Sequence, residues 1–387
     1  MEARGTEIAV GLGLASLPTP CLLLDEARML HNIERLRTRL PASVQLRPHL
    51  KTAKSPPIAH LLMTSPSGPA TVSTLREAEY FAACGVRDIL YAVGLTQAKL
   101  DRVQALRAAG VDLSVVADNL EIARAIAASS RSSGRIIPAL IEVDCDNHRA
   151  GVDPQDGAAL IEIGRALNTG AELRGVMVHA GSSYGSRSIA DIEAIAELER
   201  GAAVSSAQTL RSAGLPCPVV SVGSTPTALF GKDFNGVTEV RAGVYVFFDL
   251  VMAGLQVCSI SDIALSVLST IIDVQPSKGR AIIDAGWMAM SRDRGTSSQS
   301  VDQGYGVVCT AQGNPYLDLL MTEANQEHGV ISLRPGSKQR LPELRVGEQV
   351  RILPNHACAT SAQHDNYHVV NGTPPRVLAV WPRIRGW

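Results

Sequence analysis

The pattern of apolar and polar positions alternates between two periods from about residue 44 to residue 245. Short apolar runs rich in β-branched residues predict buried strands, and Ala-, Leu-, Arg- and Glu-rich stretches of helical period lie between most of them. The predicted strands are 44–49, 70–74, 88–93, 112–118, 136–144, 174–180, 217–223 and 237–243. Regular alternation of strand and helix predicts a parallel sheet. Eight such strands favour a closed (β/α)8 barrel, an α/β fold, over the alternative of a doubly wound open sheet.

The alternation stops near residue 255, and a different pattern follows. Strand-like segments separated by Gly, Pro and polar turns begin with IALSVLSTIIDV and end with PRVLAVWP. This shift in composition predicts a second, mainly β domain. We therefore expect a barrel over residues 20–255, and a C-terminal β domain of residues 256–387 joined by residues 1–19.

Composition and charge argue against several classes of protein. Of the 387 residues, 45% are hydrophobic and 19% are charged, which is typical of a globular chain. A formal net charge of −1 without long runs of one sign argues against nucleic acid or a membrane as partner. No apolar stretch reaches the roughly 20 residues of a membrane span, and Glu2 and Glu7 flank the N-terminal stretch IAVGLGLASLP where a signal peptide carries positive charge. Seven scattered cysteines without CxxC spacing indicate a reducing, cytoplasmic environment.

The predicted carboxyl ends of the barrel strands concentrate basic, hydroxyl and glycine residues. An active site is expected at this rim, because barrel enzymes build it from the ends of the strands. Gly223, Ser224 and Thr225 end the seventh strand, and Gly243 and Val244 end the eighth. Two adjacent turns of this kind favour a phosphate site over plain turns, since glycine allows a phosphate to approach the backbone closely.

The end of the first strand, RPHLKTAK, carries two lysines. Arg47, His49 and Lys51 alternate, so in an extended strand all three side chains point into the same space, which favours a bound anion. A lysine beside a phosphate can form a Schiff base once burial or neighbouring positive charge lowers its pKa. We expect this role for Lys51, and we expect Lys54 to be an ordinary solvated residue.

Near the end of the chain, PNHACAT places His356 and Cys358 one residue apart. In an extended segment the two side chains leave the same face and form half of a metal site. A site with two protein ligands leaves positions for water and for the hydroxyl of a substrate, so a metal there can act as a Lewis acid.

The chain resembles the D-threonine aldolase and D-serine dehydratase family from about Thr19 to Thr360, in its motifs and in their order. The motifs are TPCLLLD, RPHLKTAK, HRAGV, HAGSSY, VGSTPTA, EVRAGVYVFFD, DAGWMAMS, NQEHG and PNHACAT. The resemblance implies an alanine-racemase-like architecture, with a pyridoxal-phosphate-binding barrel followed by a β domain. It also implies a homodimer and a small D-β-hydroxy amino acid as substrate.

The resemblance implies roles for individual residues of the barrel. It makes Lys51 the Schiff-base lysine and places Arg149 beside the 3′ oxygen of pyridoxal phosphate. It places Tyr184 near the pyridine nitrogen and His179 against the face of the ring. The residues that it implies for the phosphate are Gly223, Ser224, Thr225, Gly243 and Val244.

In the β domain the resemblance implies a divalent metal on His356 and Cys358. A thiolate favours zinc, and manganese, cobalt and magnesium are the alternatives. Glu327 and His328 can hydrogen-bond a metal ligand or a bound water, although a structural turn explains them almost as well.

Two reactions use nearly the same residues. If the Cα–H bond breaks, Lys51 takes the proton, the hydroxyl leaves, and a keto acid and ammonia result; if the Cα–Cβ bond breaks, the products are glycine and an aldehyde. Within the family, aldolases tend to carry His-x-Asp and dehydratases His-x-Cys. Cys358 therefore favours a dehydratase of D-threo-3-hydroxyaspartate or D-serine, and a D-threonine aldolase is the alternative.

Two further possibilities and one detail of the substrate remain open. One is a racemase, although a racemase would not need the His-x-Cys pair. The other is a non-catalytic, single-barrel carrier of pyridoxal phosphate, although such carriers lack a long β domain. The second carboxylate of hydroxyaspartate requires a cation, for which Arg292 and Arg294 in SRDRGT are candidates. A solvated loop is the simpler interpretation of either arginine alone.

Overall fold

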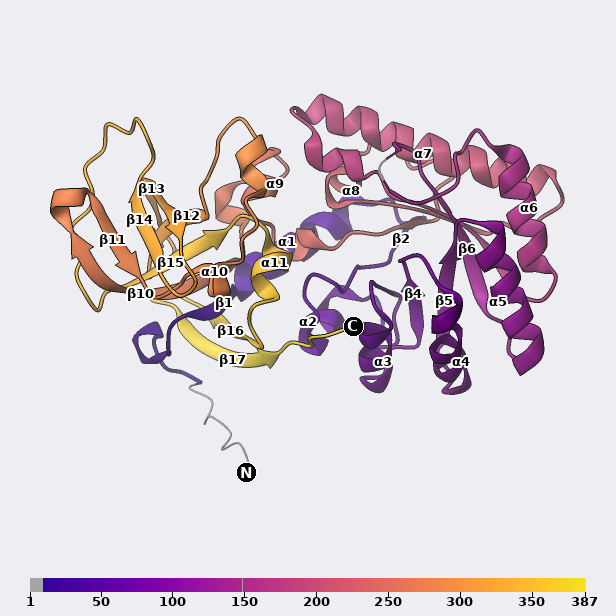
Figure 1. Cartoon of the computed structure of the whole chain (residues 1–387), viewed down its shortest axis with the longest axis horizontal. Coiled ribbons are helices and arrows are strands. Elements are labelled where there is room, and N and C mark those ends of the chain that lie inside the picture. Colours follow the sequence, from indigo (N-terminus) through magenta and orange to yellow (C-terminus); the bar gives the residue numbers. More distant parts are fainter. Residues whose placement is uncertain (1–9, 148) are drawn as a thin grey trace. The chain divides into compact units, whose positions relative to one another are not determined.

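The computed structural model describes residues 10–147 and 149–387, which fall into two compact units drawn in Figure 1. One unit combines residues 10–34 with 244–385, and the other spans 35–243 together with the last two residues. Glu2, Glu7 and the first two residues of the apolar N-terminal stretch lie outside the described residues.

The unit of residues 35–243 is a closed barrel of eight parallel strands. The strands are β2 (Gln45–Leu46), β3 (Ala70–Val72), β4 (Asp88–Tyr91), β5 (Asp112–Ala117), β6 (Pro138–Val143), β7 (Glu172–Val178), β8 (Val219–Val222) and β9 (Glu239–Val240). Their order is β2-β9-β8-β7-β6-β5-β4-β3. A bridge between His49 and Thr71 joins the segment after β2 to β3 and closes the ring. The eight predicted strands and the (β/α)8 barrel are confirmed.

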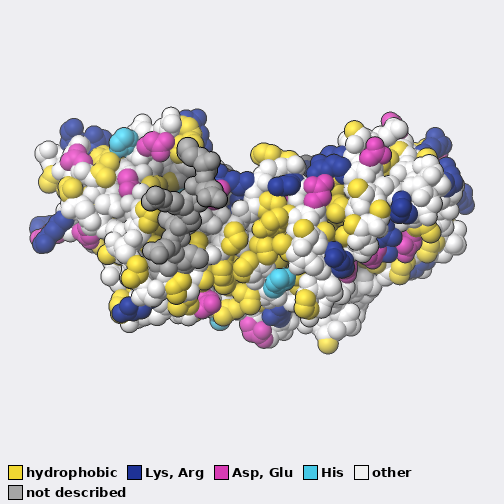
Figure 2. Space-filling model, turned by 90° about the horizontal axis from the view of Figure 1, so that it is seen from below, with side chains coloured by type: hydrophobic (Ala, Val, Ile, Leu, Met, Phe, Trp, Pro, Cys, Tyr) yellow, Lys and Arg dark blue, Asp and Glu magenta, His cyan; other side chains and the backbone are white. Residues whose placement is uncertain are grey.

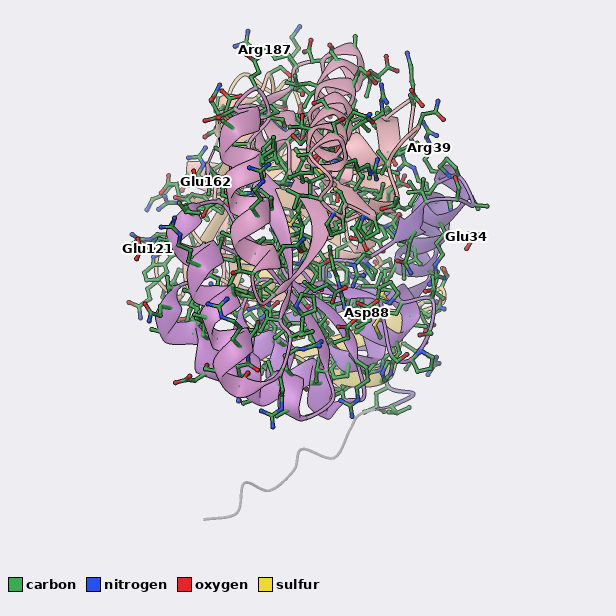
Figure 3. All side chains as sticks on the ribbon, turned by 90° about the vertical axis from the view of Figure 1, so that its right-hand side faces the viewer. Glu34, Arg39, Asp88, Glu121, Glu162 and Arg187 are labelled. Carbon is green, nitrogen blue, oxygen red and sulfur yellow. The ribbon has the colours of Figure 1, made fainter. Side chains whose placement is uncertain are left out.

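A helix follows each of the first seven barrel strands (Figure 1). The helices are α2 (Pro56–Leu62), α3 (Leu75–Ala83), α4 (Leu100–Ala108), α5 (Leu120–Ser133), α6 (Gly157–Asn168), α7 (Ile189–Ser212) and α8 (Thr225–Phe230), and α1 (Glu26–Arg39) precedes β2. Local chemistry sets their ends: Asn119 caps α5 by accepting a hydrogen bond from the Ile122 amide at 2.9 Å. Glu121 of α5 and Glu162 of α6 are exposed on the outside of this ring, as Figure 3 shows.

The interior of the barrel holds a chain of polar contacts. Arg47 Nε lies 2.5 Å from Glu239 Oε2, and Arg47 Nη1 lies 2.6 Å from Asp88 Oδ1. Ser221 Oγ donates to the other Glu239 oxygen at 2.6 Å, and Arg241 Nη1 donates to Ser221 Oγ at 2.5 Å. Two carboxylates therefore neutralise Arg47. The expectation that Arg47 shares a bound anion with Lys51 is wrong, because Glu239 and Asp88 already pair with its guanidinium.

The other unit contains a nine-stranded sheet. Its strands are β1 (Cys21–Asp25), β10 (Leu265–Gln275), β11 (Arg280–Ile283), β12 (Gly306–Thr310), β13 (Pro315–Ala324), β14 (Gly329–Leu333), β15 (Gln349–Pro354), β16 (Asn366–Asn371) and β17 (Arg376–Pro382). The strands β10-β11-β14-β13-β12-β15 pair antiparallel in a closed cycle that returns to β10. The predicted β domain is thus an antiparallel barrel, and its short helices are α9 (Leu250–Gly254), α10 (Trp287–Met290) and α11 (Ala357–Ser361).

The division between the units differs from the expected limits at residues 20 and 255. β1 pairs antiparallel with β10 and parallel with β16, so it belongs to the nine-stranded sheet and not to the barrel. Residues 244–255 also belong to this unit. An isolated apolar run such as CLLLD does not reveal which sheet it joins, because both kinds of strand are buried.

Surface and cysteine chemistry agree with the composition. Charged side chains of both signs are interspersed on the face drawn in Figure 2. None of the helices in the described part of the chain has the length and apolar character that a membrane span requires. None of the seven cysteines forms a disulfide. Burial raises the pKa of the Cys21 and Cys309 thiols to about 12, as expected for cysteines that act as small apolar side chains.

Candidate active site

Lys51 lies at the carboxyl end of the first barrel strand, and its side chain is exposed. Its backbone amide donates to His49 Nδ1 at 3.4 Å. Gly243 packs against the same segment: a Cβ there would lie 3.0 Å from Thr52 Oγ1 and 3.2 Å from His49 Cβ. The barrel thus brings Lys51 and Gly243 to one place on the rim.

The turn after β8 requires glycine at its first position. Gly223 has φ +139°, and a Cβ would lie 2.0 Å from the carbonyl oxygen of Arg241. Ser224 then caps α8, because its backbone amide donates to Thr227 Oγ1 at 3.0 Å and its own Oγ accepts from the Thr227 amide at 3.2 Å. Such a turn lets another group approach the backbone closely.

Both backbone groups of Gly223 are already engaged. His179 Nδ1 lies 2.8 Å from the Gly223 carbonyl oxygen. The Gly223 amide donates to Glu199 Oε1 at 3.1 Å, and the Ala180 amide donates to the same oxygen at 2.8 Å. Gly223 therefore contributes its conformation to the turn, while its N–H group is used by Glu199.

Glu199 is a part of the site that the sequence analysis missed. It lies on α7 with 1% of its surface exposed, and burial raises the pKa of its carboxyl. A signal was present: Ile192, Ala196, Glu199 and Ala203 follow helical spacing on the buried stripe of α7. A carboxylate on an apolar stripe is unusual unless it has partners.

Positive charge surrounds His179. The pKa of His179 is lowered to about 3, chiefly by burial; its hydrogen bond to the Gly223 backbone raises the pKa, and the charges of Arg149, Lys51 and Arg241 lower it. Burial also lowers the pKa of His49 well below its usual value, with Lys51 and Arg241 as the next causes. Lys51, Arg149 and two neutral histidines thus lie near this rim, with Arg241 inside the barrel, and this donor set fits an anionic, phosphorylated group.

The other predicted barrel residues lie near this rim. Tyr184 lies in the turn after β7 with 39% of its surface exposed, and its ring centroid is 6.3 Å from that of His179. The expectation that Lys54 is an ordinary solvated residue is wrong: its side chain is only 17% exposed, and it forms an ion pair with the buried Glu77 at 3.0 Å. The remaining residues predicted at the phosphate are buried: Ser224, Thr225 and Val244.

The predicted metal pair has a different backbone from the one expected. β15 ends at Pro354 and α11 begins at Ala357, so Cys358 lies in a helix and not in an extended segment. The side chains of His356 and Cys358 nevertheless hydrogen-bond each other, because the chain turns from strand to helix between them. In the described ranges no three His, Cys, Asp or Glu residues are grouped as a metal site.

Asp293 orients His356. His356 Nδ1 lies 2.6 Å from Asp293 Oδ2, and the Gly295 amide donates to Asp293 Oδ1 at 2.9 Å. Burial lowers the pKa of His356, but the bonds to Asp293 and Cys358 outweigh it and raise the pKa to about 11. A carboxylate on Nδ1 leaves Nε2 for a metal, which is the usual arrangement of a histidine ligand. His356 and Cys358 therefore fit a divalent metal.

Buried side chains fix the backbone on both sides of His356. Asn355 Oδ1 accepts from the Thr296 amide at 3.1 Å and from Thr296 Oγ1 at 2.5 Å. The Ala357 amide donates to Asp249 Oδ2 at 2.9 Å. Asp249, Thr296 and Asn355 are each at most 2% exposed. The ligand pair is thus held by rigid contacts and not by a free loop.

The two candidate arginines have different surroundings. Arg294 Nη2 lies 2.5 Å from Asp302 Oδ2. The exposed Arg292 stacks on the Trp287 ring, with its guanidinium carbon 4.3 Å from the ring centroid.

The NQEHG motif forms an exposed turn between β13 and β14. The Trp287 amide donates a hydrogen bond to the Asn325 carbonyl oxygen of this turn at 2.8 Å. Glu327 and His328 lie in this turn, where the Asn325 amide donates to the His328 carbonyl oxygen at 2.8 Å. The turn supports α10, and a role for the two side chains at a metal stays a prediction.

Comparisons with known proteins agree with this arrangement. The family described as "Alanine racemase, N-terminal domain" matches residues 24–251, and a serine dehydratase domain matches residues 264–370. The chain is 49% identical to D-threo-3-hydroxyaspartate dehydratase of Delftia sp. (strain HT23), over 97% of this chain and 99% of the relative. It is 29% identical to D-serine dehydratase of Dictyostelium discoideum, over 92% of this chain and 94% of the relative.

A solved structure matches the whole architecture. It is a cysteine-to-alanine mutant of D-threo-3-hydroxyaspartate dehydratase in the metal-free form, with a TM-score of 0.93 and 48% identity. The alignment covers 97% of this chain and 100% of that one. The family predicted from the motifs is confirmed. The chain belongs to the alanine racemase N-terminal domain family, among the members that continue into a serine dehydratase domain.

Proposed function

We propose that this chain is a pyridoxal-phosphate- and metal-dependent dehydratase of D-β-hydroxy amino acids, a carbon–oxygen lyase. D-threo-3-hydroxyaspartate, which would give oxaloacetate and ammonia, is the preferred substrate, and D-serine, which would give pyruvate and ammonia, is the next. The observation that carries the proposal is 49% identity to such a dehydratase over 97% of the chain.

The residues present fit both groups. Lys51, Arg149 and the turn at Gly223 would hold pyridoxal phosphate, and His356 and Cys358 would hold the metal. When bound, pyridoxal phosphate supplies an electron sink for the α carbon, and the metal supplies a Lewis acid for the β-hydroxyl. The thiolate and imidazole pair favours zinc, with manganese, cobalt and magnesium as alternatives.

The chain's own residues supply the proton chemistry and the orientation. The amine of Lys51 is the group on the rim suited to take the α proton. His179, with its low pKa, stays neutral and adds no fourth charge to the cations around it. Loss of the α proton and the β-hydroxyl leaves an enamine, which hydrolyses to a keto acid and ammonia. We also propose a homodimer, from the resemblance, and a cytoplasmic location, which seven cysteines without a disulfide support.

The test is a product assay on protein saturated with pyridoxal phosphate, after metal removal and after zinc is restored. The proposal expects ammonia and keto acid in equal amounts from each D-substrate, lost on chelation and regained with zinc. Glycine and an aldehyde as the main products would contradict the dehydratase and favour the D-threonine aldolase.

A pair of cysteine variants tests the metal separately. Cys358→Ala should abolish zinc-restored turnover. Cys84→Ala changes a partly buried cysteine at the end of α3 and should leave turnover unchanged. If Cys358→Ala keeps its activity after chelation and metal restoration, the metal site is not where we place it.

A further inference from the structure

Arg292 is an exposed cation whose guanidinium stacks on the Trp287 ring. It follows α10 in the segment 291–296, which is anchored to the metal-ligand segment at two points. Asp293 contacts His356 at 2.6 Å, and Thr296 contacts Asn355 at 2.5 Å. Arg292 is therefore the sequence neighbour of the residue that orients a proposed metal ligand.

The backbone of this segment is strongly constrained. Ser291 has φ +74°, which few residues other than glycine adopt, and it is 9% exposed. Its Oγ accepts from the Asp293 amide at 3.2 Å, and its own amide donates to the Trp287 carbonyl oxygen at 2.8 Å. These contacts fix the direction in which the chain leaves α10 and so restrict the position of Arg292.

The guanidinium of Arg292 is oriented but not neutralised. Its central carbon lies 4.3 Å from the centroid of the Trp287 ring, a distance typical of cation–π stacking. No carboxylate among the described residues forms an ion pair with it, whereas Asp302 pairs with the nearby Arg294 at 2.5 Å. Stacking engages the face of a guanidinium and leaves its N–H edge available for a carboxylate.

We infer that Arg292 binds the second carboxylate of a dicarboxylic substrate and so determines the preference for D-threo-3-hydroxyaspartate over D-serine. This inference rests on the proposed function. In 3-hydroxyaspartate the hydroxyl and the second carboxylate are on the same carbon atom. Arg292 is one residue from Asp293, which contacts the proposed ligand His356 at 2.6 Å, and we therefore place its guanidinium within reach of that carboxylate. D-serine has no group for it to bind.

The test compares kcat/KM for the two substrates in the loaded enzyme and in Arg292→Gln, Arg292→Lys and Arg294→Gln. Arg292→Gln should lower kcat/KM for D-threo-3-hydroxyaspartate by about 10- to 100-fold, the effect of a lost charge-assisted hydrogen bond. The value for D-serine should change less than about threefold, because it lacks the second carboxylate. Arg292→Lys should restore part of the loss, and Arg294→Gln should leave the ratio of the two values unchanged.

A binding measurement separates this inference from the proposed function. Malate and 3-hydroxypropanoate are the two substrates without their amino group, so their binding to the zinc-loaded protein needs no turnover. Calorimetry should show that Arg292→Gln weakens malate binding and leaves 3-hydroxypropanoate binding unchanged. Equal losses for both acids, or the same selective loss in Arg294→Gln, would overturn the role of Arg292. Absence of keto acid from the wild-type protein would instead refute the proposed function.

Discussion

Glu199 provides the most direct test of how the rim of the barrel is held. Replacing it by alanine removes the acceptor of two buried amides, those of Ala180 and Gly223. Each buried donor left without a partner costs about 1–3 kcal/mol. We expect Glu199→Ala to lower the free energy of unfolding by roughly 2–5 kcal/mol.

Glu199→Gln is the matched control. A glutamine keeps one side-chain oxygen for the two amides and carries no charge. Burial already raises the pKa of Glu199, so its charged form is disfavoured in the folded protein. The neutral replacement should therefore stay within about 1 kcal/mol of the wild type, because the acceptor and the packing are retained.

Two measurements decide the outcome. Urea unfolding of the cofactor-free protein gives the stability of each variant, and fluorescence titration gives its affinity for pyridoxal phosphate. If loosening the turn at Gly223 costs about 1.4 kcal/mol of binding, the affinity of Glu199→Ala falls about tenfold. The reasoning fails if alanine and glutamine destabilise equally, or if alanine leaves both stability and affinity at the wild-type values.

Three more predictions concern single residues. Lys51→Ala should lose the absorption band at roughly 420 nm that marks lysine-bound pyridoxal phosphate, and a retained band would refute the assignment of Lys51. Asp293→Asn should weaken zinc binding about 10- to 100-fold in competition with a chromophoric chelator, whereas Asp302→Asn should not. Burial and the charge of Asp118 raise the pKa of Glu142 to about 7 against Arg149 and Arg241. The folded state therefore holds a proton that the unfolded state releases above about pH 4.5, and stability is lost as the pH rises from there through 7. Glu142→Gln should remove this loss of up to about 3 kcal/mol between pH 4.5 and 7.5, and urea unfolding with an unchanged pH dependence would contradict it.

The sequence predicted the barrel well because its signal is local and repeated. Each barrel strand is an apolar run, and stretches of helical period separate most of these runs, so many local signals supported one architecture. The place of β1 was harder, since CLLLD has the same composition whether it joins a parallel or a mixed sheet. Its partners are Leu268 and His368, and only the complete fold brings them to it.

The sequence predicted the site residues whose role follows from their own chemical type. It predicted less well the residues whose role depends on a partner far away in the sequence. Lys51 and Gly243 could be placed together because the ends of adjacent barrel strands meet. Asp293 lies between two arginines in SRDRG, and the sequence does not reveal that His356, far along the chain, is its partner. The pairing of His356 with Cys358 was expected from an extended segment, and a strand-to-helix turn produces it instead.

The position of β1 has a consequence for the synthesis of the protein. Cys21, Leu22, Leu23 and Leu24 are at most 6% exposed in the finished sheet, yet both neighbouring strands are translated after the whole barrel. The barrel can fold while the chain is still growing, whereas this apolar strand must wait for β10 and then for β16. A ribosome that stops before residue 366 would release a chain with one edge of β1 uncovered, open to pairing with other chains. Truncation near the C-terminus is therefore expected to cause aggregation through a segment from the opposite end of the chain.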